Sequence, residues 1–175
     1  MSETESTAAT AEDEAAEVAR SWVRAVMDER DLARAWPLTD PDLRLVLVQH
    51  WILSHEGDDV VGPPEGWDAL AEGLAACPPQ HPAWDRFAQE RLRRWREFWT
   101  GFSAVTWGLR HVRASNRPDV WVVTFVEPRG KLMSLKPGPP LEFRHLSVRR
   151  REEGFHVAGL DGGALFKPGW PPTPG

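Results

Sequence analysis

Apolar residues recur with a helical period through the first half of the chain and alternate with polar residues in much of the second half. The clearest helical stripe runs through "PAWDRFAQERLRRWREFW", which opens with Pro82 and stops before Gly101. An earlier stripe begins at Ala11 and breaks near Asp31, while Asp40 followed by a proline is a strong start signal for a further helix. Shorter helices are expected in "DLARAWP" and "WDALAEGLAAC", so this half is predicted to be helical.

The second half of the chain predicts strands. Apolar and polar residues alternate in "SAVTWGLRHVRA", "DVWVVTFVE" and "LEFRHLSVRR", and "FHVAGL" follows as a fourth strand after the "REEG" turn. Short connections between such strands are typical of an antiparallel meander. Helices that come first and strands that follow indicate an α+β fold, with the helices packed on one face of a curved sheet.

The chain length of 175 residues fits one domain with a core large enough to need no disulfide, and Cys77 has no second cysteine to pair with. Residues 1–10 are expected to be disordered, residues 11–166 to form the single domain, and residues 167–175 to form an extended, proline-rich tail. The first residues lack the basic and apolar regions of a signal peptide, and no uncharged apolar run is long enough to span a bilayer. A cytoplasmic protein without a membrane partner is therefore expected.

The charge of the chain is unevenly distributed. The formal net charge is -5, but residues 1–17 hold six acids and no base, and the remaining residues hold 20 acids against 21 bases. Because the chain after residue 17 is almost neutral, it is not expected to have the strongly basic surface that binds nucleic acid. The composition of ten Trp, no Tyr, 18 Arg and three Lys indicates a GC-rich bacterial genome, and the missing tyrosine excludes any mechanism that needs a phenolic hydroxyl.

Three features of the chain resemble the nuclear transport factor 2-like superfamily: the long first helix, the break between helices in "RDLARAWPLTDPDLR", and the closing meander of aromatic strands. The superfamily includes polyketide cyclases of the SnoaL type, ketosteroid isomerases and limonene epoxide hydrolases, and the resemblance covers most of residues 11–160. It implies a cystatin-like cone, in which the helices and a strongly curved antiparallel sheet enclose an apolar pocket. The catalytic groups of the known enzymes are not carried over, because they include a tyrosine hydroxyl, and Asn116, the only asparagine, lies in a predicted turn.

The alternation of the strands predicts which side chains face the helices. A turn at "SNRP" pairs His111 with Val123, and a connection from Pro128 to Pro140 pairs His145 with the same valine. A slip of two residues would keep these faces, whereas a slip of one would invert them. The predicted helix-facing side chains are Trp107, Leu109, His111, Trp121, Val123, Phe125, Glu127, Phe143 and His145.

These side chains suggest a site for proton transfer inside the pocket. Imidazoles titrate near neutral pH, and burial shifts the pKa of a carboxyl, so His111, Glu127 and His145 are the predicted catalytic residues. The alternative is that each is a hydrogen-bonded polar group at the margin of the sheet. The predicted ligand-binding residues are aromatic or apolar: Trp51, Trp107, Leu109, Trp121, Phe125 and Phe143.

His50 stands beside Trp51 in an otherwise apolar segment and has two interpretations. It either borders the pocket or, the better-supported interpretation, is a core histidine bonded to a backbone carbonyl. His50 and His55 are five residues apart, about 140° around a helix, so they are badly placed to share a metal. No metal site and no cofactor is expected.

The sequence leaves three hypotheses for the function. The protein is an isomerase, cyclase or hydrolase that acts on a hydrophobic small molecule, a ligand-binding protein without turnover, or a dimerisation module whose own Trp and Phe side chains fill the pocket. A cavity below roughly 300 Å³ would favour the module. A homodimer through the outer face of the sheet is expected, because that face is apolar where an antiparallel sheet facing water is normally polar. Its predicted contact residues are Val120, Val122, Thr124, Val126, Leu146 and Val148.

Overall fold

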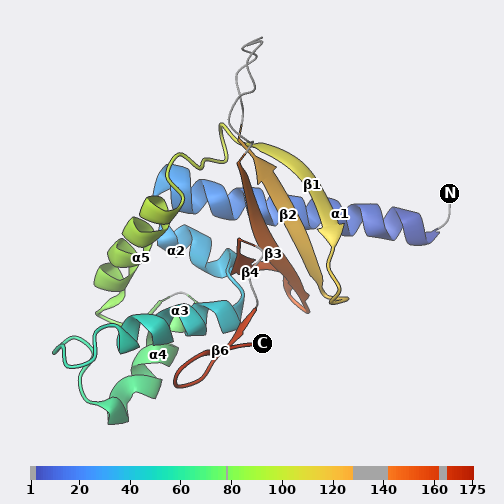
Figure 1. Cartoon of the computed structure of the whole chain (residues 1–175). Coiled ribbons are helices and arrows are strands. Elements are labelled where there is room, and N and C mark those ends of the chain that lie inside the picture. Colours follow the sequence, from blue (N-terminus) through green and yellow to red (C-terminus); the bar gives the residue numbers. More distant parts are fainter. Residues whose placement is uncertain (1–2, 78, 128–141, 162–164) are drawn as a thin grey trace.

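The helices of the protein precede a four-stranded antiparallel sheet in the computed structural model, which describes residues 3–77, 79–127, 142–161 and 165–175 (Figure 1). The helical segments are α1 (Glu3–Val23), η1 (Arg24–Glu29), α2 (Leu32–Ala35), η2 (Trp36–Leu38), α3 (Pro41–Leu53), η3 (Pro64–Gly66), α4 (Trp67–Ala75) and α5 (Trp84–Phe98). The strands are β1 (Gly108–Ala114), β2 (Val120–Val126), β3 (Phe143–Arg151), β4 (Gly154–Leu160), β5 (Phe166–Lys167) and β6 (Thr173–Pro174). The sheet order β1-β2-β3-β4 confirms the predicted α+β class and the antiparallel meander.

Helix α1 lies across one face of the sheet and contacts all four of its strands (Figure 1). We call this face the inner face and the opposite one the outer face. The buried stripe of Ala15, Ala19, Trp22 and Val26 has the three- and four-residue spacing of an amphipathic helix and continues into η1. The helix begins at Glu3, inside the segment predicted to be disordered, because alanine and glutamate have high helix propensity.

Local hydrogen bonds build the break between the first two helices. Arg30 has a left-handed backbone conformation, with a φ of 59°, and ends η1. The Asp31 carboxylate accepts a hydrogen bond from the backbone N–H of Arg34 at 3.0 Å and caps α2. The first helix therefore stops where the sequence predicts a break.

Backbone and side-chain bonds join the start of α3 to the sheet. The Asp40 carboxylate caps the helix by accepting from the backbone N–H of Asp42 at 3.0 Å, as predicted. The backbone N–H of Asp40 donates to the carbonyl of Val157 in β4 at 2.9 Å. Arg151 of β3 donates two hydrogen bonds to the same buried carboxylate, at 2.9 and 3.0 Å. This cluster holds the helical part of the protein against β3 and β4.

Aromatic rings fill the space between the helices and the inner face. The largest fully buried aromatic side chains are Trp22, Trp36, Trp51, Trp99, Phe87 and Phe125. Trp22 makes edge-to-face contacts with Trp95 and Trp99, at centroid distances of 5.1 and 6.2 Å. Phe102 packs edge-on against Phe125 of β2 at 5.4 Å. Such contacts add specific geometry to hydrophobic burial, so the interior is a packed aromatic core.

The C-terminal residues fold back onto the helices. β5 and β6 pair with each other as a short hairpin, a pairing that the sequence does not predict. The backbone N–H of Gly169 donates to Oε1 of Gln49 in α3 at 3.0 Å. The indole Nε1 of Trp170 donates to Oδ1 of Asp68 in α4 at 2.7 Å. These bonds hold the hairpin on α3 and α4.

Candidate functional site

The pairing of β1 with β2 contains a bulge that inverts part of the predicted faces. Leu109 lies opposite Phe125, as predicted. Beyond the bulge, however, His111 lies opposite Thr124 and not opposite Val123. One extra residue in a strand moves every following side chain to the other face. The prediction that His111 faces the helices is therefore wrong.

The pairing of β2 with β3 differs from the predicted pairing by one residue. His145 lies opposite Thr124, and Phe143 lies opposite Val126. Both side chains are therefore on the outer face, and the prediction that they face the helices is wrong. The connection predicted from Pro128 to Pro140 lies outside the described residues.

The outer face is less apolar than the sequence predicts. Leu146 and Val148 are fully buried in the inner core, so the prediction that they belong to an outer dimer surface is wrong. Val120 is buried beside Leu165, which leaves Val122 and Val126 as the half-buried valines of this face. Histidine, arginine, threonine and serine side chains surround Val122, and Phe143 lies opposite Val126. This mixture is the one expected of a binding surface rather than of a core.

The predicted ligand-binding residues on the inner face are core side chains. Trp107 and Phe125 both pack edge-on against Phe102, at centroid distances of 5.0 and 5.4 Å. Residues packed in this way contact one another instead of lining open space. The other predicted residues that lie in or against the same core are Trp51, Leu109 and Trp121.

Glu127 follows the last residue of β2, and its backbone N–H donates to the carbonyl of Glu142 at 3.1 Å. Alternation along the strand puts the Glu127 side chain on the same side as Phe125 and on the opposite side from Thr124. The sheet therefore separates Glu127 from both histidines, and the prediction that the three residues share one cavity is wrong.

His111 and His145 meet on the outer face, one on each side of Thr124. The Thr124 hydroxyl is 3.3 Å from Nε2 of His111 and 3.0 Å from Nδ1 of His145. The three residues lie opposite one another on β1, β2 and β3. Thr124 is only 1% exposed, so its hydroxyl has the two imidazoles as partners in place of water.

A hydroxyl between two imidazoles couples their protonation. It has one proton to donate and two lone pairs that accept. When it donates to one ring nitrogen, it can accept from the N–H of the other ring, and the reversal of both bonds moves a proton from one ring to the other. The pair can therefore take up a proton at one imidazole and release a proton at the other, as a general base and a general acid do.

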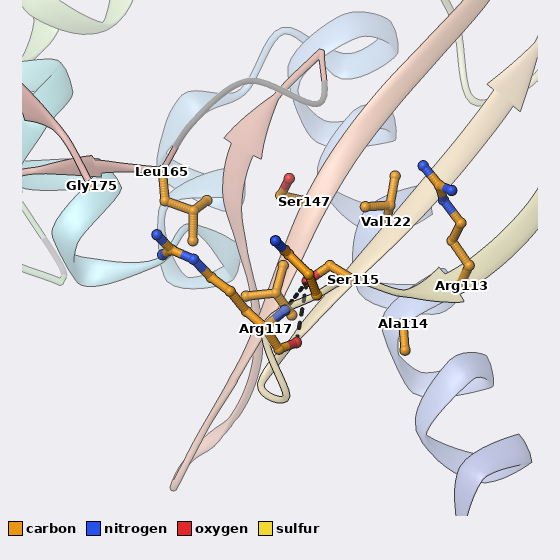
Figure 2. A pocket seen from close by; sticks show the side chains of 10 residues that line it. Arg113, Ala114, Ser115, Arg117, Val122, Ser147, Leu165 and Gly175 are labelled. Atoms are coloured by element: carbon orange, nitrogen blue, oxygen red, sulfur yellow. Dashed lines mark hydrogen bonds between the residues drawn. The ribbon is translucent and has the colours of Figure 1, made fainter.

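A hollow of about 440 Å³ lies on the outer face next to this row of three residues. Figure 2 shows the side chains that line the hollow. Its lining residues are Arg113, Ala114, Ser115, Asn116, Arg117, Val120, Val122, Ser147, Leu165 and Gly175. Val122 is two residues from Thr124 on β2, and Ser147 is two residues from His145 on β3, so the hollow and the row share one face of the sheet. The volume lies within the range of small-molecule sites.

Two arginines border the hollow. Arg113 is two residues from His111 on β1, and Arg117 lies in the turn between β1 and β2. Figure 2 shows their side chains on opposite sides of the hollow. The Ser115 hydroxyl fixes this turn, because it accepts from the backbone N–H of Arg117 at 3.0 Å and donates to the Arg117 carbonyl at 3.2 Å. The hollow therefore combines an apolar floor with positive charge on two sides.

A second polar cluster joins α3 to α5 around Glu90. Oε2 of Glu90 lies 3.1 Å from both Trp51 Nε1 and His55 Nε2, and Oε1 accepts from Arg86 at 3.2 Å. Burial raises the pKa of Glu90, but the hydrogen bonds from Trp51 and Arg86 and the charges of His55 and Arg86 outweigh it, so the pKa is lowered. Both oxygens are engaged, which makes the cluster a link between helices. Sequence reasoning missed it, although Arg86 and Glu90 are four residues apart on α5, and His55 follows Trp51 by four residues in the turn after α3.

His50 is an exposed residue of α3 whose ring meets Phe166 edge-on at 6.0 Å. Partial burial and the positive charge of Arg91 lower the pKa of His50. Arg91 donates to the carbonyl of Leu47 at 2.9 Å, and burial lowers the pKa of Arg91 to about 10. Among the described residues, the His50 ring makes no hydrogen bond to a backbone carbonyl, which contradicts the interpretation of a core histidine.

Neither a metal cluster nor a membrane helix is found in the described part of the chain. Across residues 3–77, 79–127, 142–161 and 165–175, no three His, Cys, Asp or Glu side chains are grouped to hold a metal ion. Over the same ranges, no helix is long and apolar enough to cross a membrane.

Comparison of the chain with protein-family models, with curated proteins and with solved structures gives no match. The candidate site therefore rests on its own geometry: two imidazoles that share the hydroxyl of Thr124, next to a hollow bordered by arginines.

Proposed function

We propose that the protein binds a small molecule in the hollow on the outer face and transfers a proton on it through His111 and His145. The observation that carries this proposal is the Thr124 hydroxyl, held between the two imidazoles beside the hollow. Two imidazoles, which can act as a general base and a general acid, share one hydroxyl on a face that a ligand can reach. The proposed function is that of an isomerase, cyclase or hydrolase.

The lining of the hollow supports a substrate that is partly apolar. Val120, Val122 and Leu165 supply apolar surface, and Ser147 adds a hydroxyl next to it. Small-molecule sites commonly combine apolar walls with a few polar groups that fix orientation. The substrate would lie on Val122 and reach the imidazoles at its far end.

The test uses 1-anilinonaphthalene-8-sulfonate, a fluorescent probe with apolar rings, and follows the histidine ring signals by NMR. We expect the probe to shift the signals of His111 and His145 in parallel as it is titrated. His81, which lies between α4 and α5 and outside the sheet, serves as the internal control and should not respond. Shifts confined to His81, or no shift in any histidine at saturating probe, would contradict binding on the outer face.

A second candidate function is a dimerisation module. Two observations favour it: aromatic rings fill the interior, and Phe143 on the outer face is 42% exposed. A dimer through this face would cover the hollow, so the two functions compete for one surface. Light scattering of the wild-type protein and of Phe143→Glu separates them. A dimer that dissociates on this substitution supports the module, whereas a monomer in both cases supports the ligand site.

We also propose that the fold is a variant of the nuclear transport factor 2-like cone and that the protein is cytoplasmic. A long first helix across an antiparallel meander supports the cone. In that superfamily the pocket lies between helices and sheet, whereas aromatic rings occupy that space here, which is why we propose the outer face as the site. A crystal structure in which the sheet curls strongly around α1 would support the cone, and a flat sheet would contradict it. Cell fractionation tests the location.

A further inference from the structure

The hollow on the outer face is bordered by two exposed arginines, Arg113 and Arg117. In the part of the chain that the structure describes, no carboxylate forms an ion pair with Arg113 or Arg117. Arg86 and Arg151, by contrast, each pair with two carboxylates. The Ser115 hydroxyl bonds to the backbone of Arg117 and orders the turn, so the Arg117 side chain extends from a fixed point of the backbone. Two guanidinium groups that border one hollow and have no carboxylate partner within the described ranges are available to bind an anion there.

The spacing of the strands sets the distance between this charge and the histidines. Arg113 and His111 are two residues apart on β1, as are Val122 and Thr124 on β2. Two residues of a strand span about 7 Å. A ligand whose charged group binds at Arg113 would therefore place an atom about 7 Å away over Thr124, between the two imidazoles.

We propose that the ligand is a small organic anion whose carboxylate, phosphate or sulfate group binds to Arg113 and Arg117 and whose apolar body lies on Val122. The proposal rests on the proposed function, because it names the substrate class of the same site. Guanidinium groups bind such oxyanions through charge-assisted hydrogen bonds. One imidazole takes a proton from the ligand and the other returns a proton to it, so the charge of the pair is unchanged over the reaction.

The experiment compares two probes that differ in charge. 1-Anilinonaphthalene-8-sulfonate carries a sulfonate, and N-phenyl-1-naphthylamine has the same rings without it. Their affinities are measured by fluorescence for the wild-type protein, for Arg113→Gln, for Arg117→Gln and for the double variant. Arg93→Gln is the matched control, because Arg93 is an exposed arginine on α5 that pairs with Glu97. Circular dichroism checks that each variant is folded.

We expect the wild-type protein to bind the anionic probe at least about tenfold more tightly than the neutral one, a difference of about 1.4 kcal/mol. Arg113→Gln and Arg117→Gln should each weaken the anionic probe several-fold and leave the neutral one unchanged, and Arg93→Gln should change neither. If inorganic phosphate displaces the anionic probe, the charged group of the ligand is a phosphoryl group. If acetate displaces it, the charged group is a carboxylate.

Equal affinity for the two probes, with no effect of either arginine, would overturn the anion proposal while leaving the proposed site intact, provided that both probes shift the signals of His111 and His145. Binding of neither probe near these histidines would instead overturn the proposed function, and the anion proposal with it. Anionic binding that survives in the double variant and is lost in Arg93→Gln would overturn the assignment to this hollow.

Discussion

Replacing Asp40 with asparagine tests how strongly the helical part of the protein is tied to the sheet. The Asp40 carboxylate is 1% exposed, accepts two hydrogen bonds from Arg151 and caps α3. Asparagine caps a helix as well as aspartate does, so Asp40→Asn removes the charge of the ion pair and keeps the cap. Asp40→Ala removes both, and the difference between the two variants isolates the cap.

The expected magnitude follows from the exposure of the partners. Removing one member of a buried ion pair costs about 3–5 kcal/mol. Arg151 is 33% exposed and keeps Asp42 as a partner at 2.7 Å, which reduces the loss. We expect Asp40→Asn to lower the free energy of unfolding by about 2–3 kcal/mol and Asp40→Ala by about 1 kcal/mol more. Asp42→Asn is the control, because that carboxylate is 46% exposed, and it should lose about 1 kcal/mol or less.

Urea unfolding followed by tryptophan fluorescence measures these differences, since the buried indoles report on the packing of the core. A loss of about 2–3 kcal/mol corresponds to a fall in Tm of roughly 4–12 °C for a chain of this size. If Asp40→Asn and Asp42→Asn agreed within about 0.5 kcal/mol, the contact between Asp40 and Arg151 would not be a main tie between helices and sheet.

Two further predictions concern pH. The pKa of Glu90 is lowered from 4.5, so its ionised form stabilises the folded state above that value, and the stabilisation is lost as the pH falls through the lowered pKa. Glu90→Gln should therefore be less stable than the wild type at pH 7 and equally stable in acid, measured by urea unfolding at a series of pH values; a constant difference would contradict this. The pKa of His50 is lowered from 6.5, so the neutral ring favours the folded state and stability falls as His50 is protonated below that value. NMR titration should give a midpoint below 6.5 that rises in Arg91→Met, and a midpoint unaffected by this substitution would refute the role of the Arg91 charge.

The helices could be predicted from the sequence because their signals are local. Asp40 followed by Pro41 begins α3, and the aromatic stripe that starts at Trp84 continues through α5. Alternation likewise identified the strands of the sheet and put Leu109 opposite Phe125. The connection from Glu90 to α3 could not be predicted, because Trp51 is 39 positions away in the chain and only the packed structure brings the two together.

The candidate site could be predicted only in part, because strand register is not a local property. The sequence predicts His111 and His145 in one row across β2, and they do share a row, but on the other face of the sheet. The bulge after Leu109 adds one residue, and Gly108, an isolated glycine in the predicted strand, is a weak signal that could have indicated it. The connection between β2 and β3 is too long for a turn type to fix the pairing. The β1–β2 pairing and the β2–β3 pairing each differ from the predicted pairing by one residue, and a difference of one residue puts a side chain on the opposite face. Both histidines therefore lie on the outer face, still in one row.

The central claim is that Thr124 couples the two imidazoles, and the protonation of individual ring nitrogens tests it most directly. Nitrogen-15 NMR, at a pH where both rings are neutral, reports which nitrogens carry a proton. Of the two nitrogens that face the Thr124 hydroxyl, Nε2 of His111 and Nδ1 of His145, we expect one to be protonated and the other not. In Thr124→Val this relation should be lost. Finding both nitrogens protonated or both unprotonated in the wild-type protein, or the same pattern in the valine variant, would contradict the account.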